Sequence, residues 1–434
     1  LLGCAVWFTL RTRGVQFRML REMVRVLGEP SGSAPGGERH VSSFQAFAVS
    51  LASRVGTGNL AGVATAIVVG GPGAVFWMWV IALVGAASAF VESTLAQLYK
   101  RRGRDSYVGG PAYYMEYGLG KRWMGVLFAV LISVTFGFAF NSVQSNTICA
   151  AWEGAFGLDP HWIGVGLTAL TLLVIFGGIH RIARVSGVIV PVMALGYILL
   201  ALGIVLFNIR RLPEVLGLIL SEAFGWGPVL GGAAGAALMQ GIKRGLYSNE
   251  AGMGSTPHAH AQANVKDPHE QGVVAMIGVF IDTFVVLTLN ALVIICTLYT
   301  ADGPLANGYV GDVTSVLSKT NLAQTAFGSV MGASLGAKFV AICLFFFAFS
   351  TVLSWNLFGK INAIWLFGKK NPKACTVVYT LIALVFILMG TMMSNDLVWE
   401  LTDMFNNLMV IPNVIALFAL TKMVVGGAES KIAQ

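Results

Sequence analysis

The sequence predicts an all-α integral membrane protein with about 11 transmembrane helices, namely a five-plus-five inverted repeat and one N-terminal helix. Of its 434 residues, 56% are hydrophobic and only 11% are charged, whereas a soluble globule carries about 25% charged residues. Apolar runs of about 20 residues, each long enough to cross a ~30 Å hydrocarbon core, recur along the chain. Glycine and polar residues interrupt the first and sixth core runs, and these interruptions predict two broken helices.

Residues 1–27 are predicted to form an N-terminal helix, which ends near Leu10, and an amphipathic cytoplasmic segment. This segment carries arginines at spacings typical of a helix that lies on a membrane surface: Arg11, Arg13, Arg18, Arg21 and Arg25. Residues 28–42 are rich in Gly, Ser and Pro, a composition that predicts a linker.

The core is predicted to comprise a first repeat at residues 43–207 and a second repeat at residues 228–421. An extracellular connection at residues 208–227 joins the repeats, and a cytoplasmic tail follows at residues 422–434. The expected spans are residues 43–71, 73–98, 123–150, 162–178, 185–207, 228–250, 272–298, 334–358, 374–393 and 397–421.

The distribution of Lys and Arg supports this topology. With the arginines after Leu10 on the cytoplasmic side and the sides alternating, 21 of the 28 Lys and Arg fall in inner segments and three in outer segments. Cytoplasmic loops of membrane proteins carry such an excess of positive charge. The formal net charge of +8 therefore follows from topology, and we expect a lipid bilayer and no nucleic acid as partner.

The first interruption, at residues 53–62, reads Ser-Arg-Val-Gly-Thr-Gly-Asn-Leu-Ala-Gly. Backbone groups that lose their hydrogen bonds in lipid cost several kcal/mol each, so such a break indicates a buried site. Unwound carbonyl oxygens suit a cation, and the N–H groups of the next half-helix suit an anion.

The second interruption comprises residues 240–245 and the polar residues 248–250. It aligns with the first at four positions, which pair Arg54 with Arg244, Asn59 with Asn249, Ala61 with Ala251 and Gly62 with Gly252. Paired breaks in the first and sixth core helices are typical of inverted repeats that bind substrate and ions at the membrane midplane. The alternative is two glycine-rich seams where helices pack closely.

Three segments, at residues 56–67, 70–79 and 245–255, resemble the alanine/glycine:cation symporter family. The resemblance implies the leucine-transporter-type fold and sodium-coupled uptake of alanine or glycine across a prokaryotic inner (plasma) membrane. It implies a multi-pass protein with no cofactor and with sodium as the coupling ion, and the distribution of Lys and Arg predicts a cytoplasmic C-terminus. The break at residues 56–59 is also similar to the glycine–x–glycine–asparagine break of sodium-coupled neurotransmitter-type transporters.

The implied substrate is a small zwitterion, whose two ends need opposite partners. We expect the N–H groups of Thr57 and Gly58 to bind its carboxylate. Carbonyls freed around Gly241 and Ile242 are expected to bind its ammonium group.

Two further side chains are candidates for substrate contact. Gln144 lies in a polar stretch at residues 141–146, and it either contacts substrate or forms interhelical hydrogen bonds alone. Trp355 either caps the pocket or is a packing tryptophan.

Two sodium sites follow from the resemblance. Ser350 and Thr351 resemble the paired hydroxyls of the superfamily's second sodium site, with the carbonyls of Ala52 and Val55 as partners. The alternative is that both hydroxyls bond to carbonyls of their own helix. Asn59 is the expected ligand of a first sodium ion.

Charged residues at membrane depth are candidates for gating. Glu250 is expected to pair with Arg244 or Lys243 as an inner gate. Arg54 is expected to point away from the sodium ligands, towards Glu92 or Glu250.

Asp282 lies within an apolar span, where an unpaired carboxylate is costly, so we expect it to be hydrogen-bonded or to have a gating role. His258, His260 and His269 fall in a polar connection, where we expect exposure to solvent rather than a metal site.

The preferred hypothesis is therefore a sodium-driven alanine/glycine symporter that works by alternating access. A proton-coupled symporter of small amino acids is the alternative, and a channel is a further one, although a channel needs a continuous polar pore. A membrane-embedded enzyme needs a catalytic or metal constellation at depth, which the sequence lacks. No Gly-x-x-x-x-Gly-Lys-Ser/Thr motif occurs, so ATP is not an expected partner.

Overall fold

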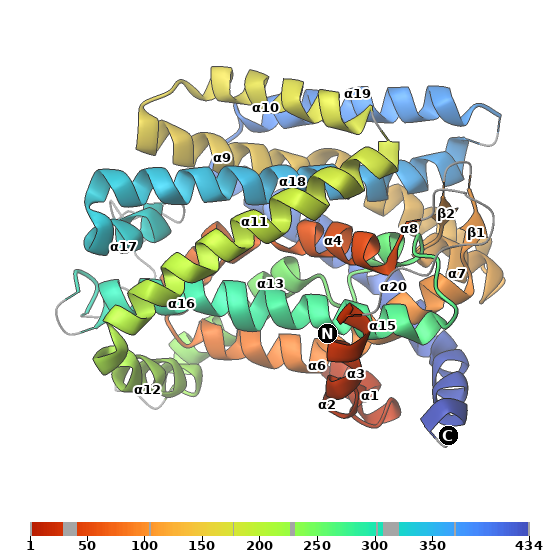
Figure 1. The fold of residues 1–434 in the computed structure, drawn as a ribbon, viewed down its shortest axis with the longest axis horizontal. Helices are drawn as coiled ribbons and strands as arrows, with labels where there is room; N and C mark the ends of the chain where they lie inside the picture. The colour runs from red at the N-terminus through yellow and green to blue at the C-terminus, as the bar shows by residue number, and fades with distance from the viewer. Residues whose placement is uncertain are drawn as a thin grey trace.

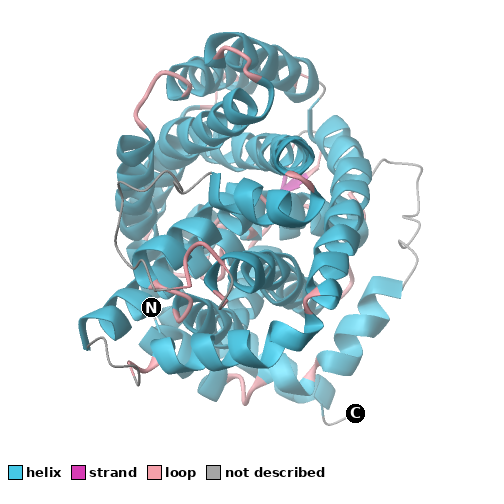
Figure 2. Ribbon diagram, turned by 90° about the vertical axis from the view of Figure 1, so that its left-hand side faces the viewer, coloured by secondary structure: helices cyan, strands magenta, loops and turns pink. Residues whose placement is uncertain are grey.

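The computed structural model describes residues 2–28, 41–103, 106–176, 178–225, 231–300, 303–306, 321–368 and 370–432. These residues are almost entirely helical, and their one strand pair joins β1 (Arg101–Arg102) to β2 (Tyr107–Val108) in antiparallel order. Figure 1 shows the long helices running in roughly the same direction, and Figure 2 views them nearly end-on. The predicted all-α class is confirmed.

Seven helices in the described part of the chain are long and apolar enough to cross a membrane. Five are single α-helices: α6 (Ala74–Leu98), α11 (Gly178–Phe207), α18 (Ala333–Phe367), α19 (Pro372–Gly390) and α20 (Asn395–Ile432). The other two contain π-helical turns and are α8–η2–α9 (Arg122–Phe156) and α15–η4–α16–η5 (Pro268–Tyr299).

Shorter elements complete the predicted spans. The first core span is divided into α4 (Ser43–Arg54), the π-helical η1 (Gly58–Gly62) and α5 (Val63–Gly70). The N-terminal helix is α1 (Leu2–Arg11), the fourth core span is α10 (Pro160–Ile175) and the sixth is α13 (Gly231–Asn249). The remaining helices are α2 (Val15–Arg18), α3 (Leu20–Gly28), α7 (Pro111–Tyr117), η3 (Ile209–Arg211), α12 (Leu212–Ala223), α14 (Pro257–His260) and α17 (Asn321–Met331).

Two predicted connections differ in how much of them the structure describes. Most of the predicted linker at residues 28–42 lies outside the described residues. The predicted connection at residues 208–227 contains η3 and α12, so much of it is helical. Trp77 of α6 donates its Nε1–H to the carbonyl of Ala223 at the end of α12 (3.1 Å), which holds this connection against the core.

Local sequence explains where the helices begin. Ser42 and Gln45 form a capping box at the start of α4, since each side chain bonds to the backbone N–H of the other residue. Asp159 and Asp267 cap α10 and α15, and a proline follows each of them at the first helical position. These caps satisfy N–H groups that the first turn of a helix leaves unpaired.

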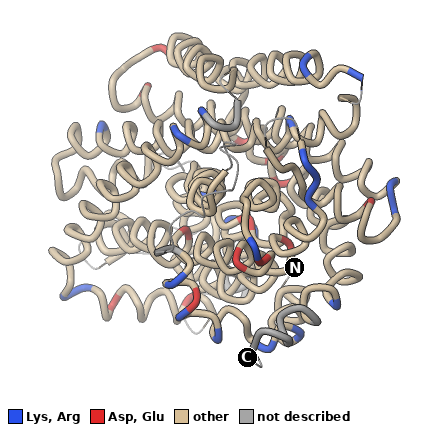
Figure 3. The backbone as a smooth tube through the Cα atoms, turned by 45° about the vertical axis from the view of Figure 1, so that its right-hand side comes forward, with Lys and Arg blue, Asp and Glu red and all other residues tan. Residues whose placement is uncertain are grey.

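The helices are arranged so that polar side chains lie inside the molecule. α11 and α19 expose apolar side chains along their lengths, as expected for helices that face lipid. Figure 3 shows that the long helices carry few charged residues. α4 packs against α11, α18 and α15, while α13 packs against α5 and α6, so both broken helices lie at the centre of the molecule.

Candidate functional site

The chain leaves the helical path between α4 and η1. Val55 has φ −79° and ψ 85°, outside the helical region. The N–H of Gly56 donates to the side-chain oxygen of Asn59 (3.0 Å), and the Asn59 N–H donates to the Gly56 carbonyl (3.3 Å). The asparagine therefore replaces part of the interrupted helical ladder, and the break predicted in the first core helix is confirmed.

Close approach of other helices explains the two glycines of this break. A Cβ atom on Gly56 would lie 2.6 Å from the Thr351 hydroxyl oxygen. A Cβ atom on Gly58 would lie 3.2 Å from the Cα of Ser248. Glycine at these positions lets side chains of α18 and the end of α13 reach the unwound backbone.

Thr351 is in contact with carbonyl groups of the break, as predicted. Its Oγ1 lies 2.8 Å from the Ala52 carbonyl oxygen, 3.3 Å from that of Val55 and 2.9 Å from that of Phe347. One hydroxyl hydrogen serves only one of these three oxygens at a time. Ser350 differs, because its hydroxyl donates to the Phe347 carbonyl of its own helix (2.9 Å). Of the predicted pair, only Thr351 therefore brings its hydroxyl oxygen to the carbonyl oxygens of the break.

Asp282 is the point where the two broken helices meet. Its carboxylate is fully buried and accepts hydrogen bonds from Asn59 Nδ2 (2.7 Å) and from Ser248 Oγ (3.0 Å to Oδ2). Thr283 Oγ1 adds a further donor at 3.2 Å. The expectation that this carboxylate is hydrogen-bonded is confirmed, and its partners come from both breaks.

A second layer of side chains holds Asn59 in place. Asn290 Nδ2 donates to the Asn59 carbonyl (2.8 Å), and Tyr197 donates its hydroxyl to Asn290 Oδ1 (2.9 Å). All three residues are fully buried. The position of the Asn59 backbone is thus fixed by side chains of α16 and α11.

The second break lies later in the chain than predicted. α13 is a continuous helix that ends at Asn249, so Gly241 and Ile242 lie inside it and the prediction that their carbonyls are freed is wrong. The break begins at Glu250, a non-glycine residue with a positive φ of 53°. Two glycines with positive φ follow, Gly252 (81°) and Gly254 (86°). These conformations, which glycine adopts without strain, take the chain out of the helix.

The end of α13 lacks the donors that an unbroken helix supplies. The N–H of Ala251 donates to the Asn249 side chain (3.0 Å), and the N–H of Gly252 donates to Glu92 Oε1 (3.1 Å). The N–H of Gly254 donates to the second oxygen of Glu92 (3.1 Å). The last carbonyls of α13 therefore lose their helical partners, while a carboxylate from α6 binds the N–H groups of the break.

Helix packing explains the glycines that suggested an earlier break. A Cβ atom on Gly241 would lie 2.5 Å from the Ala74 carbonyl oxygen. A Cβ atom on Gly245 would lie 2.7 Å from Ile81 Cγ2. These two glycines let α13 approach α6, so the packing-seam alternative is correct for them.

Thr57 and Gln144 meet at the first break, and Tyr247 joins them. The N–H of Thr57 donates to Gln144 Oε1 (3.3 Å), and Gln144 Nε2 donates to the Tyr247 hydroxyl (3.3 Å). The hydroxyls of Thr57 and Tyr247 are themselves hydrogen-bonded (3.3 Å). All three residues are buried. Gln144 therefore bonds both to the unwound segment and to a side chain near the end of α13.

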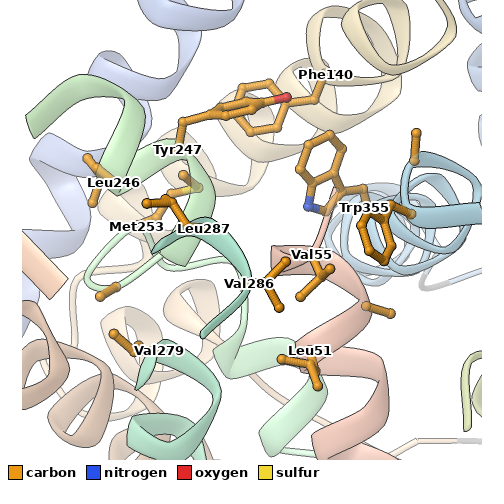
Figure 4. Close-up of a cluster of buried hydrophobic side chains, with 14 of the residues drawn as sticks. Leu51, Val55, Phe140, Leu246, Tyr247, Met253, Val279, Val286, Leu287 and Trp355 are labelled. Atoms are coloured by element: carbon orange, nitrogen blue, oxygen red, sulfur yellow. The ribbon is translucent and has the colours of Figure 1, made fainter. Parts of the chain in front are cut away.

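Trp355 forms one wall of this region, together with other aromatic rings. Its ring centroid lies 4.7 Å from that of Phe140 and 6.0 Å from that of Tyr247. Figure 4 shows these three rings, which come from three different helices, in one cluster with Val55 of the first break. The indole Nε1–H donates to Glu250 Oε1 (2.7 Å). Trp355 is thus a packed tryptophan whose polar edge is bound by the second break.

Glu250 connects several elements through its carboxylate. Besides Trp355, it accepts hydrogen bonds from Ser53 Oγ at the end of α4 (3.2 Å) and from Ser255 Oγ (2.5 Å). It is fully buried. This carboxylate therefore joins the two breaks to α18.

Arg54 points towards the end of α13 and α14. Its Nε donates to the Asn249 carbonyl (2.8 Å), Nη1 to Ser50 Oγ (3.0 Å) and Nη2 to Thr256 Oγ1 (3.2 Å). These hydrogen-bond partners are neutral, while the predicted carboxylates of Glu250 and Glu92 interact with the guanidinium through their charges alone. The guanidinium consequently stabilises the second break by bonding to a carbonyl at its edge.

The predicted pairing of Arg244 with Glu250 is wrong. Arg244 instead makes a two-point ion pair with Asp403 of α20, at 2.9 and 2.8 Å. Its guanidinium also lies 4.6 Å from the ring centroid of Trp399. Lys243 Nζ lies 3.6 Å from the same carboxylate. Arg244 therefore connects α13 to α20 and not to the second break.

Two of the three histidines are fully buried, contrary to expectation. His260 is hydrogen-bonded to Gln271 through Nδ1 (2.9 Å) and to the Ser50 hydroxyl through Nε2 (3.0 Å). His258 is bonded to Asn362 Nδ2 (2.8 Å). The short helix α14 places both rings in the core. The polar composition of the segment predicts exposure instead.

Sequence reasoning missed Tyr247 and Asp403, gave Ser248 of the second interruption no partner, and expected Glu92 only as a partner of Arg54. Asp403 carries a signal, because an acidic residue within an apolar helix usually has a partner. The role of Tyr247 becomes visible only once the true end of α13 is known. Among the described residues, no group of three His, Cys, Asp or Glu side chains is arranged to hold a metal ion. The site offers carbonyl, hydroxyl, amide and carboxylate oxygens instead, which suits a hard monovalent cation beside a small polar molecule.

Comparison with known proteins is consistent with this arrangement. A model of the sodium:alanine symporter family matches residues 1–430. The chain is 47% identical over 424 residues to GlnT of Bacillus subtilis, described as a probable sodium/glutamine symporter, with 98% of this chain and 85% of the relative covered. It is 38% identical over 435 residues to AgcS of Methanococcus maripaludis, described as a sodium/alanine symporter, with 99% and 92% covered.

Among solved structures, the crystal structure of MhsT in complex with L-phenylalanine matches with a TM-score of 0.61. The two chains are 13% identical, and the match covers 87% of this chain and 89% of that one. At this identity the likeness shows the fold alone, which is the leucine-transporter-type fold of membrane transporters.

Proposed function

Because the chain belongs to the sodium:alanine symporter family, we propose that it carries alanine or glycine into the cell together with sodium. Membership of this family makes the protein a sodium-coupled amino-acid symporter and not an enzyme. The identity of the amino acid and the direction of transport are the parts that we propose. We also place the protein in a prokaryotic inner membrane, because its relatives come from bacteria and archaea, and its C-terminus in the cytoplasm, on the distribution of Lys and Arg described above.

The observation that carries the proposal is the meeting of both breaks at Asp282. Asn59 comes from the first break and Ser248 from the end of α13, and both donate to the same buried carboxylate. A buried carboxylate without a directly bonded cation is costly, and a bound sodium ion supplies the missing positive charge. We therefore assign Asn59, Asp282 and Ser248 to a first sodium site.

A second sodium site is proposed at Thr351. The Ala52 carbonyl has lost its helical donor, because the Gly56 N–H bonds to Asn59 instead. The Val55 carbonyl lies beside it, and the single hydroxyl hydrogen of Thr351 leaves lone pairs available on these oxygens. Unwound carbonyls of this kind coordinate sodium in transporters with broken helices.

The substrate is proposed to lie between the two breaks. The N–H groups at Thr57 and Gly58, where a helical segment begins, suit its carboxylate. The carbonyls of Tyr247 and Ser248 are the ones that lose donors at the end of α13, so they suit its ammonium group. Gln144 contributes a neutral polar contact beside them.

The close packing between the two breaks favours a small side chain. The rings of Phe140, Tyr247 and Trp355 pack against one another in the cluster that also contains Val55 (Figure 4). The glycines of the first break already stand within 3.3 Å of other side chains, measured from the Cβ atoms they lack. Alanine and glycine fit such a site better than a longer amino acid.

Alternating access is proposed to use the two repeats at residues 43–207 and 228–421. Each repeat opens with a broken helix, and the broken helices pack in the centre of the molecule. Movement of the bundle that contains α4 and α13 against the remaining helices would expose the site to one side of the membrane at a time.

Uptake into proteoliposomes tests this function. With sodium outside only, labelled alanine is expected to accumulate above its external concentration, and collapse of the sodium gradient is expected to abolish accumulation. Equilibration without any sodium requirement would indicate a channel, and accumulation driven by a proton gradient in sodium-free buffer would indicate proton coupling. Competition by excess glycine, but not by glutamine, would support the small-substrate assignment.

A further inference from the structure

Helices α2 and α3 expose an apolar face and a basic face at the edge of the molecule. Phe17, Leu20 and Val24 are 53%, 53% and 75% exposed. Their spacing of three and four residues places them on one side of a helical path. The two short helices are separated by Met19 alone, whose backbone angles (φ −93°, ψ 12°) stay close to the helical region.

The basic face lies next to the apolar one. Arg18, Arg21 and Arg25 are exposed and follow the same spacing one residue further along the chain. Arg25 pairs with Glu22 on its own helix. Arg11, at the end of α1, is also exposed and lies over the ring of Trp7 (5.7 Å).

The third face fixes the segment to the body of the protein. Met23 and Val26 are buried, and α3 packs against α15 while α2 packs against α6. Figure 1 shows α1, α2 and α3 beside these two helices. The segment is therefore a fixed part of the surface, with its exposed faces held in one orientation.

We propose that α2 and α3 bind the headgroups of anionic phospholipids in the membrane leaflet on their side of the protein. An interfacial helix buries its apolar face in the boundary between headgroups and acyl chains, which is the role of Phe17, Leu20 and Val24. Arginine binds phosphate oxygens by two parallel hydrogen bonds, which is the role of Arg18 and Arg21.

The proposed lipid site lies against two helices that carry residues of the candidate functional site. α15 continues directly into η4, which carries Asp282, and α6 carries Glu92, which binds the second break. Anionic lipid at α3 therefore stabilises the two helices that position these carboxylates. This consequence for transport rests on the proposed function, whereas the binding of lipid does not.

The test measures lipid retained by the purified full-length chain in native mass spectrometry, after exchange into micelles with equal phosphatidylglycerol and phosphatidylcholine. Wild-type protein is expected to retain phosphatidylglycerol preferentially. The variant R18Q/R21Q is expected to lose this preference by about tenfold or more, since each basic group near an anionic surface contributes on the order of 1 kcal/mol, a factor of about five. The charge-retaining R18K/R21K variant is expected to keep more of the preference than R18Q/R21Q, because lysine keeps the charge but not the two parallel hydrogen bonds, and this separates loss of charge from loss of fold.

K370Q/K373Q is the matched control, because it removes two exposed lysines from another segment on the same predicted side. Retention by R18Q/R21Q equal to that of the wild type, or an equal loss in K370Q/K373Q, would overturn the proposal. In proteoliposomes, sodium-driven alanine uptake is expected to rise with the fraction of phosphatidylglycerol in wild-type protein but not in R18Q/R21Q. Preferential lipid retention without any alanine uptake would contradict the proposed function and leave the lipid site standing.

Discussion

The two breaks bind their unpaired backbone N–H groups in different ways. In the first, Gly56 and Gly58 mark the interruption, and a neighbouring side chain, Asn59, replaces a lost hydrogen bond. In the second, the N–H groups of Gly252 and Gly254 are bound by Glu92, which belongs to another helix. An N–H group of the first break is thus bound by a side chain of the break itself, whereas two N–H groups of the second break are bound by a residue distant in sequence.

This comparison shows that a glycine within an apolar run can have either of two structural roles. At Gly252 and Gly254 it permits a positive φ, whereas at Gly241 and Gly245 it permits close packing of α13 on α6. Both uses leave the same residue in the sequence. The position of a break is therefore better indicated by polar residues that have partners than by glycines alone.

The largest expected effect is at Asp282, the residue that the two breaks share. Substitution Asp282→Ala leaves Asn59 and Ser248 without their acceptor, and hydrogen bonds to a charged group contribute roughly 1.5–3 kcal/mol each. Sodium-driven alanine uptake is expected to fall by about 100-fold or more. The exposed Glu400→Gln serves as the control, with unchanged uptake. Uptake by the Asp282→Ala protein within about threefold of wild type would show that the breaks do not act through this carboxylate.

The second break is tested at Glu92. Substitution Glu92→Gln keeps the shape of the side chain but removes the charge that binds two N–H groups and Asn413 Nδ2 (3.1 Å). We expect a loss of roughly 2 kcal/mol of stability, seen as a lower melting temperature of the purified protein. Asn59→Ala, which removes one bond within the first break and one donor to Asp282, is expected to lower the melting temperature less, because two bonds are affected instead of three. The reverse order would contradict the distinction between local and tertiary support.

The first break is tested by comparing two adjacent hydroxyls. Thr351→Val removes the hydroxyl that contacts Ala52 and Val55, whereas Ser350→Ala removes one that bonds within its own helix. We expect the sodium concentration for half-maximal uptake to rise about fivefold to tenfold in Thr351→Val and less than about twofold in Ser350→Ala. An equal or larger shift in Ser350→Ala would instead support a sodium site formed by both hydroxyls.

The smallest expected effect is at Tyr247, which joins the breaks through neutral bonds only. Substitution Tyr247→Phe removes the hydroxyl bonded to Thr57 and Gln144. A neutral hydrogen bond contributes about 1 kcal/mol, so the Michaelis constant for alanine is expected to rise about fivefold. The same substitution in a Gln144→Ala background is expected to have a smaller effect, because the bond to Gln144 is already lost and only the bond to Thr57 remains. Independent, additive effects would argue against a joint contact.

The sequence alone was sufficient for those features that depend on composition and local order. The helical class, the break at residues 53–62 and the contact of Thr351 with Ala52 follow from apolar runs, from glycines beside polar residues and from the stated family resemblance. The end of α13 could not be placed in this way, because its glycines serve packing against α6. Partners such as Asp403 for Arg244 and Glu92 for Gly252 are distant in sequence, and only the fold brings them together.

The most direct test of the account is the dissociation constant of alanine for the purified protein, measured calorimetrically in sodium chloride and in choline chloride at equal ionic strength. Shared coordination by the two breaks predicts at least about tenfold tighter binding of alanine in sodium, and alanine must then tighten sodium binding by the same factor. Equal dissociation constants in the two salts would contradict the claim that one site between the breaks holds both the amino acid and its driving ion.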